Sequence, residues 1–207
     1  MTEEIRKRLE KQIQFILEID NEKNIFRQTS LTGRIRKEND AEHAWHMAIM
    51  TYLLREYANE PFDLAHTMMM CLIHDIVEID AGDTYAYDEE NKKSQKEREE
   101  KAAERIFSLL PQDQKKEIYD LFEEFEANET AEARFAHAMD NFQPLLLNDS
   151  NDGGDWQEHQ VSRKQVDGRQ SGSLAGSKII YEKTKEILDK HDAAGHFRKE
   201  EEDQKGK

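Results

Sequence analysis

The segment from Met68 to Asp83 constrains the fold more than any other part of the chain. It follows Pro61 and Asp63, two residues suited to a helix start, and it ends near Gly82, a common stop signal. Its apolar residues face nearly every direction of a 3.6-residue period, which is the pattern of a helix buried on all sides. The sequence therefore predicts a helical protein with this segment at its centre.

Three ionisable residues, His74, Asp75 and Glu78, interrupt this apolar segment. A buried carboxylate without a partner is costly, so buried charges are normally paired or bound to a metal. His74 and Glu78, four residues apart, would share a helix face, whereas Asp75 would be rotated by about 100° from His74. Two alternatives are open at this point: a divalent cation, or a core histidine hydrogen-bonded to a neighbouring carboxylate.

The amino-acid composition limits the classes of molecule that this protein can bind. Of the 207 residues, 36% are charged, 36% are hydrophobic and only 3 are proline, which is typical of a soluble helical domain with charged outer faces. The formal net charge of −15, without a basic stripe, disfavours binding to polymeric nucleic acid. A small anionic substrate is still compatible, because a metal and a few arginines can reverse the local sign.

The single cysteine, Cys71, excludes an internal disulfide and fits a reducing compartment. It lies in the apolar segment, where we expect a small buried hydrophobe rather than the alternative, a metal ligand. The first residues lack the apolar core of a signal peptide, and no run approaches the ~18 apolar residues of a membrane span. We therefore expect a cytoplasmic protein without membrane association.

Two further predicted helices carry ionisable residues. Asp40 can cap a helix that has His43 in its first turn. A later helix carries Asp140 on the same side as Ala133 and Ala136, whose small side chains let another helix approach closely, as a shared metal site would require.

The segment 24–40 is polar, lacks a helical period and is predicted to be a loop. Its arginines, Arg27, Arg34 and Arg36, could clamp an anion, and the alternative is a solvated surface loop. The segment 83–88 is a second polar loop, rich in tyrosine, which we expect at the mouth of the site.

The ends of the chain complete the predicted organisation. An apolar stripe within residues 5–17 predicts an amphipathic first helix that packs on the core by one face. A last amphipathic helix is predicted from about 174 to 188. No linker divides the chain, so we expect one domain over 1–198 and a charged, fraying tail over 199–207. The role of the loop 148–172, as a cover for the site or a subunit contact, is open.

Four ionisable residues from three predicted helices form an ordered series: His43, His74, Asp75 and Asp140. This series, together with the flanking segments 38–46 and 74–84, resembles the HD-domain metal-dependent phosphohydrolases, and in particular the branch that contains 5′-deoxynucleotidases. The resemblance covers most of residues 13–187. It implies an all-α, single-domain helical bundle with a metal site between its central helices.

The resemblance also implies roles for individual residues. The four residues of the series would bind one divalent cation, and their ligand types do not choose among Mn, Co, Fe, Zn and Mg. Glu78 and Asp83 would assist catalysis. An arginine ahead of the first metal histidine would contact phosphate; Arg27 is the nearest match, and Arg34 and Arg36 are alternatives.

The preferred hypothesis is an enzyme that releases phosphate from (deoxy)nucleoside 5′-monophosphates by metal-activated water. A second hypothesis keeps the metal but changes the nucleotide to a triphosphate, a cyclic nucleotide or ppGpp. A third is a non-catalytic metal- or nucleotide-binding helical module. Glu78 and Asp83 argue against the third, because a binding module need not keep both candidates for proton transfer. By resemblance alone, we expect a homodimer.

Overall fold

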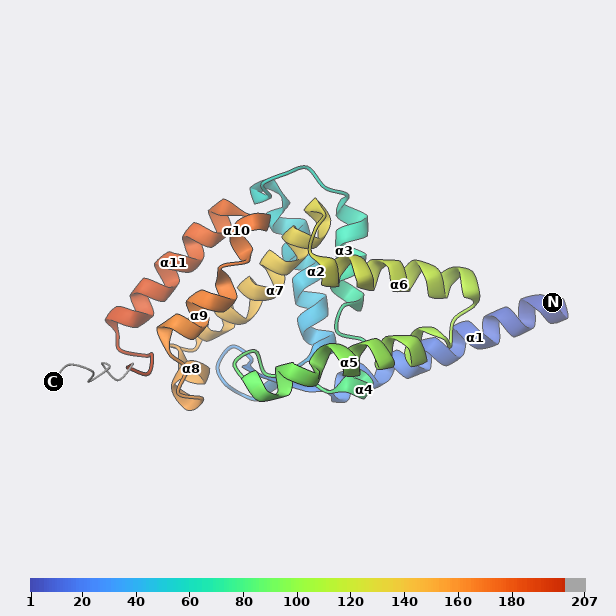
Figure 1. The fold of residues 1–207 in the computed structure, drawn as a ribbon, viewed down its shortest axis with the longest axis horizontal. Coiled ribbons are helices and arrows are strands. Elements are labelled where there is room, and N and C mark those ends of the chain that lie inside the picture. The colour runs from blue at the N-terminus through green and yellow to red at the C-terminus, as the bar shows by residue number, and fades with distance from the viewer. Residues whose placement is uncertain (200–207) are drawn as a thin grey trace.

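Three helices form the centre of the fold: α2 (Asp40–Leu54), α3 (Leu64–Ile73) and α7 (Ala131–Ser150). They pack against one another (Figure 1). The structure is a computed structural model, and it describes residues 1–199. Fully buried side chains such as Met47 and Met139 fill the space between these helices. Removing this apolar area from water is the main driving force for their association.

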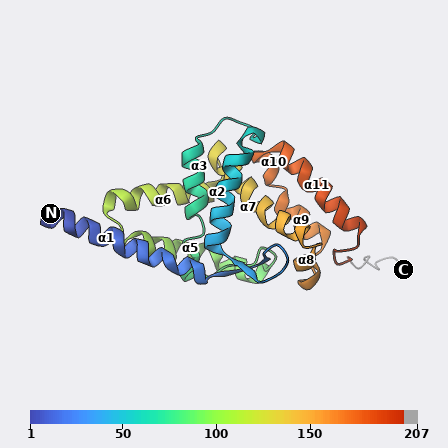
Figure 2. The same cartoon turned by 180° about the vertical axis from the view of Figure 1, so that it is seen from behind.

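The other helices surround this centre: α1 (Glu3–Ile19), α4 (Glu78–Ala81), α5 (Glu89–Phe107), α6 (Gln112–Ala127), α8 (Gly154–Glu158), α9 (Arg163–Gln170), α10 (Ser173–Gly176) and α11 (Lys178–Ala193). Short 3₁₀ helices η1 (Asp20–Asn24) and η2 (Arg55–Tyr57) follow α1 and α2. Helices α8 to α11 lie at one end of the molecule, and α1 and α6 extend toward the other (Figures 1 and 2). The predicted all-α bundle is confirmed.

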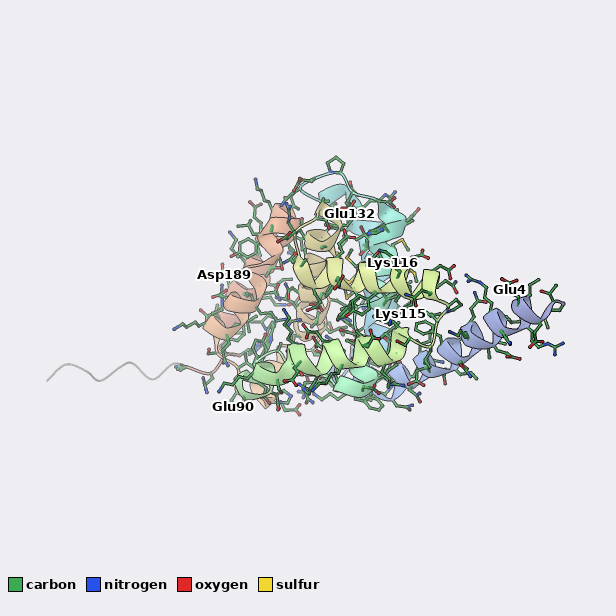
Figure 3. The ribbon with its side chains drawn as sticks, turned by 45° about the vertical axis from the view of Figure 1, so that its right-hand side comes forward. Glu4, Glu90, Lys115, Lys116, Glu132 and Asp189 are labelled. Atoms are coloured by element: carbon green, nitrogen blue, oxygen red, sulfur yellow. The ribbon has the colours of Figure 1, made fainter. Side chains whose placement is uncertain are left out.

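Charged side chains cover the outside of this bundle. Figure 3 shows Glu4 near the free end of α1 and Asp189 on α11, both on the outer surface. This is the arrangement that the charged composition predicts, because an ion exposed to water has no desolvation cost.

The central apolar segment is not one helix, and the prediction of a continuous helix buried on all sides is wrong. Helix α3 ends at Ile73, residues 74–77 form a turn, and α4 begins at Glu78. Met69 and Leu72 are 41% and 40% exposed, so α3 has a solvent-facing side. The turn is closed by backbone hydrogen bonds between residues three apart, such as the bond from the N–H of Glu78 to the carbonyl of Asp75.

The polar segment ahead of α2 was predicted to be a loop, but it forms a small antiparallel sheet. Strand β1 (Phe26–Ser30) pairs with β2 (Lys37–Asn39). Asn39, rather than the predicted Asp40, caps α2: its side chain accepts from the backbone of Glu42, whose side chain accepts from the backbone of Asn39. Asp40 is therefore free to point inward, and it is fully buried.

Helix α1 does not pack on the core by its apolar stripe, contrary to the sequence-based prediction. Phe15 is its buried residue. The residues of the stripe are exposed by 44% at Leu9 up to 67% at Leu17. The helix projects from the body of the molecule (Figure 2), so this apolar face has no partner within the described residues of one protomer.

The C-terminal region contains two helices where the sequence predicted one. Helix α10 ends at Gly176, and the side chain of Ser177 then caps the start of α11. The predicted charged tail lies outside the described residues from 200 onward, and the single domain over 1–198 stays a prediction. In the described part of the chain, no helix has the length and apolar character needed to cross a membrane.

Candidate metal centre

Four predicted ligands from three parts of the chain converge at one place: His43, His74, Asp75 and Asp140. Helix α2 supplies the first, the turn after α3 the next two, and α7 the last. Ligand atoms of His43, His74 and Asp75 lie within 4.8 Å of one another. Oδ1 of Asp140 lies 3.1 Å from Nε2 of His43, and Oδ2 of Asp75 lies 3.1 Å from Nε2 of His74.

Hydrogen bonds on the far side of each imidazole fix its tautomer. Nδ1 of His74 lies 2.9 Å from the carbonyl oxygen of Cys71, which can only accept, so Nδ1 carries the proton. The Nε2 amide of Gln143 donates to Glu38 over 2.7 Å, which directs its Oε1 toward Nδ1 of His43 at 2.9 Å. The Nδ1 proton thus lies on the far side of each ring, and each ring turns its Nε2 toward the centre.

This arrangement fits a divalent cation. Nε2 of each histidine faces a carboxylate oxygen at 3.1 Å, a contact that either a proton on the nitrogen or a cation between the two atoms makes attractive. Nε2 of His74 is also buried without a hydrogen-bond partner. Two imidazoles and two carboxylates suit several first-row divalent metals. The four side chains could therefore hold one such ion.

The protonation states of the two histidines differ. Burial lowers the pKa of His43 to about 4, so its imidazole is neutral at pH 7. Burial also lowers the pKa of His74, but the carboxylates of Asp75 and Asp140 outweigh burial and raise that pKa to about 9. Without a metal, a proton on His74 supplies the positive charge that the carboxylates require. A cation must displace that proton.

We therefore expect cation binding and His74 protonation to compete. Below the raised pKa of about 9, each bound Mn²⁺ should release a proton. The affinity should then increase up to ~10-fold per pH unit and level off above that pKa. Calorimetric titration in two buffers of different ionisation enthalpy measures the protons released. An affinity that is independent of pH, with no proton release, would contradict this competition.

A second group of carboxyls, from Asp40, Glu78 and Asp83, lies beside the first. Their oxygens lie within 4.8 Å of one another, so this group could also hold a cation. Burial raises the pKa of Asp40 to about 8, and that of Glu78 well above its usual range. Burial also raises the pKa of Asp83. One oxygen each of Asp40 and Glu78 is buried without a hydrogen-bond partner. The raised pKa values make all three carboxyls more ready to hold a proton than free carboxyls are.

A cavity of about 310 Å³ opens onto both groups. Its wall includes His74, Glu78, Asp83 and the aromatic side chains of Tyr85 and Trp156. The predicted position of the tyrosine loop at the mouth of the site agrees with this lining. The cavity thus places carboxyls that can transfer protons and a candidate metal centre next to space for a small molecule.

The family model described as HD domain matches residues 19–180 of this chain. The chain belongs to the HD domain family. The sequence-based resemblance is thus confirmed at the level of the family, and the four predicted ligands all lie within the matched range.

Other HD domain proteins show how far the similarity extends. The chain is 32% identical over 111 residues to human 5′-deoxynucleotidase HDDC2, covering 54% of this chain and 53% of that protein. It is 30% identical over 135 residues to the Xenopus laevis protein of the same name, covering 65% and 66%. The chain thus spans only about half to two thirds of these relatives' length.

A solved structure extends the comparison over nearly the whole chain. It is described as a predicted metal-dependent phosphohydrolase from Magnetospirillum magnetotacticum MS-1. Its sequence is 48% identical, the match covers 93% of this chain and 97% of that one, and the TM-score is 0.89.

The HD domain places its three predicted phosphate arginines differently. Arg27, on β1, lines the cavity, and its Nη1 lies 2.6 Å from Oδ2 of Asp75. Arg34 pairs with Glu158 and Arg36 with Glu42, each over 2.5 Å on the exposed surface. Neither of these two is among the residues that line the cavity.

Sequence reasoning missed several polar residues of this HD domain site. Asp40 was assigned to a helix cap, although its nearness to His43 in sequence could have indicated a place in the site. Gln143 follows Asp140 by three residues, and this spacing puts both on one face of α7. Arg169, on α9, donates to Oδ2 of Asp140 over 3.2 Å, and no local pattern indicated it.

Proposed function

We propose that this HD domain releases phosphate from (deoxy)nucleoside 5′-monophosphates. One observation carries the proposal: the Nε2 atoms of two imidazoles face two carboxylates, next to a cavity lined by carboxyls of raised pKa. The residues proposed as metal ligands are His43, His74, Asp75 and Asp140. The names of the HDDC2 relatives support a nucleotide substrate.

The divalent cation, when bound, polarises the phosphate and lowers the pKa of a bound water. Glu78 accepts a proton from the attacking water, and its raised pKa makes its carboxylate a stronger base than a free one. The water oxygen forms a bond to phosphorus while the bond from phosphorus to the 5′-oxygen breaks. Asp83 gives its proton to that leaving oxygen, and Arg27 donates to the phosphate oxygens that carry the transition-state charge.

The charge of the cavity wall favours a monophosphate over a triphosphate. Besides the carboxyls at the centre, Glu99 on α5 is 9% exposed and lines the cavity. Burial raises its pKa to about 7, so it is partly ionised at neutral pH and negatively charged at higher pH. Each added phosphate would bring further negative charge toward these carboxylates.

A nucleotide screen tests the proposal. The protein is incubated with Mn²⁺ or Co²⁺ and, separately, with deoxynucleoside monophosphates, ribonucleoside monophosphates, a triphosphate, a cyclic nucleotide and ppGpp. We expect free phosphate from the monophosphates, and none when a chelator is present. Release from the triphosphate, cleavage of the cyclic nucleotide, or tight nucleotide binding without hydrolysis would each contradict the proposal.

We also propose that the protein is a homodimer that buries its exposed apolar surface. Figure 2 shows α1 and α2 on the same side of the molecule. Leu17 on α1 is 67% exposed, and Trp45 and Leu53 on α2 are 61% and 60% exposed. Large apolar side chains exposed on one side of a protein are typical of a protein–protein interface.

Light scattering after size exclusion should therefore give about twice the chain mass of 24.3 kDa. Leu17→Glu combined with Leu53→Glu should shift the protein toward the monomer, because each would bury a charge in the interface. Ile35→Glu is the matched control, since Ile35 is 85% exposed on the loop between the strands. A monomeric wild-type protein would refute the dimer.

The free cysteine is the basis for a further proposal, a cytoplasmic location. Cys71 is fully buried, and burial raises the pKa of its thiol to about 12. Such a thiol is inert, and a chain whose single cysteine is inert forms no disulfide that an oxidising compartment would support. Fractionation of cells that produce the protein tests this location.

A further inference from the structure

Arg169 is a second arginine on the wall of the cavity. It lies in the last turn of α9, and its guanidinium is held less firmly than that of Arg27. The Arg27 side chain is 11% exposed and contacts both Asp75 and Asp40, whereas the Arg169 side chain is 27% exposed and contacts Asp140. Arg169 therefore has more freedom to meet a ligand.

The contact with Asp140 places Arg169 next to the candidate metal centre. One oxygen of Asp140, Oδ1, faces Nε2 of His43, and the other, Oδ2, accepts from Arg169 over 3.2 Å. A guanidinium has five N–H donors, and this is the one hydrogen bond that Arg169 makes within the described residues. Its remaining donors can bind an anion that approaches a cation held by Asp140.

Helix α9 is fixed so that Arg169 faces the cavity. The next residue, Gln170, is 3% exposed and donates from its side chain to the backbone carbonyl of Asn141 on α7 over 2.8 Å. Val166, one turn earlier, is 1% exposed in the core. The backbone at Arg169 is thus anchored on the helix that carries Asp140, which reduces the entropy lost on binding.

The charge of the site favours such a residue. Asp75 and Asp140 are carboxylates of lowered pKa, and Arg27 is already paired with two carboxyls, so a further cation beside the divalent ion would stabilise a bound phosphate dianion. We propose that Arg169 is a second phosphate-binding residue, which donates to a non-bridging oxygen of the substrate phosphate. This inference rests on the proposed function, because it assumes a phosphate at the metal centre.

The test measures the binding of inorganic phosphate to the Mn²⁺-loaded protein by calorimetry. Arg169→Ala should weaken phosphate binding by ~10–100-fold, since charge-assisted hydrogen bonds are lost. Arg169→Lys should give an intermediate loss, because lysine keeps the charge but not the planar fork. Metal content should stay at the wild-type level in both variants.

Arg163→Ala is the matched control on the same helix. Arg163 pairs with Asp167 and Asp189 and lies outside the cavity lining, so its variant should bind phosphate as the wild type does. Unchanged phosphate affinity in Arg169→Ala would overturn the inference. Loss of Mn²⁺ in both Arg169 variants would also overturn it, because Arg169 would then serve to hold Asp140. Failure of the wild type to hydrolyse any nucleotide would refute the proposed function alone, since the phosphate titration is independent of turnover.

Discussion

His74→Ala should lose the bound cation and, with it, phosphate release. His74 turns its Nε2 toward the centre, where this atom is buried and lacks a hydrogen-bond partner. Without it, one nitrogen ligand is gone and the carboxylate of Asp75 faces an empty space. Loss of groups that merely support a metal ligand costs ~10–100-fold in affinity, so loss of a ligand should cost more. Metal analysis after dialysis, run beside a phosphate-release assay, measures both effects.

The control for this variant is His66→Ala, on helix α3, which leads into the turn that carries His74. His66 pairs with Glu124 over 2.7 Å, and its side chain is 40% exposed, away from the centre. We expect this variant to keep its metal and its turnover. A His74→Ala protein that retains one Mn²⁺ per chain and wild-type activity would remove His74 from the proposed ligand set.

Glu78→Gln should keep the cation and lower kcat by ~10²–10⁴-fold, the usual contribution of a general base. The amide has nearly the shape of the carboxyl but cannot accept the proton of the attacking water. Glu78 is 7% exposed, lines the cavity and is outside the group formed by His43, His74 and Asp75. Steady-state kinetics at saturating Mn²⁺, with metal analysis on the same sample, separates catalysis from metal binding.

Asp80→Asn provides the comparison for Glu78→Gln, because both residues lie on the short helix α4. Asp80 points away from the cavity and pairs with Arg105 on the surface. Its variant should turn over at the wild-type rate. Full activity of Glu78→Gln would show that another group activates the water, and loss of metal would make Glu78 a ligand instead of a base.

The helices of this protein could be predicted because apolar residues recur at helical spacing, and that pattern survives without tertiary information. The order of His43, His74, Asp75 and Asp140 also indicated the HD family, whose model matches the chain. The local geometry around His74 was not predictable. A turn with bonds between residues three apart carries the same apolar pattern as a helix over 74–77, so the sequence could not distinguish them.

Other features depend on contacts between distant segments. The strands β1 and β2 are short and polar, and they form because each supplies the other's backbone partners. Whether the apolar stripe of α1 is buried depends on a binding partner. The sequence of one chain does not specify that partner. Arg169 pairs with Asp140, which lies 29 positions earlier in the sequence. No periodicity encodes such a pairing, so only the folded structure could reveal it.

Anomalous diffraction from crystals grown with Mn²⁺ tests the central assignment most directly. Data collected at the manganese edge should show one strong peak between the side chains of His43, His74, Asp75 and Asp140, with ligand atoms near the ~2.0–2.2 Å typical of first-row metals. A map without a peak there, or with its strong peak at a site that none of these four residues reaches, would contradict the account.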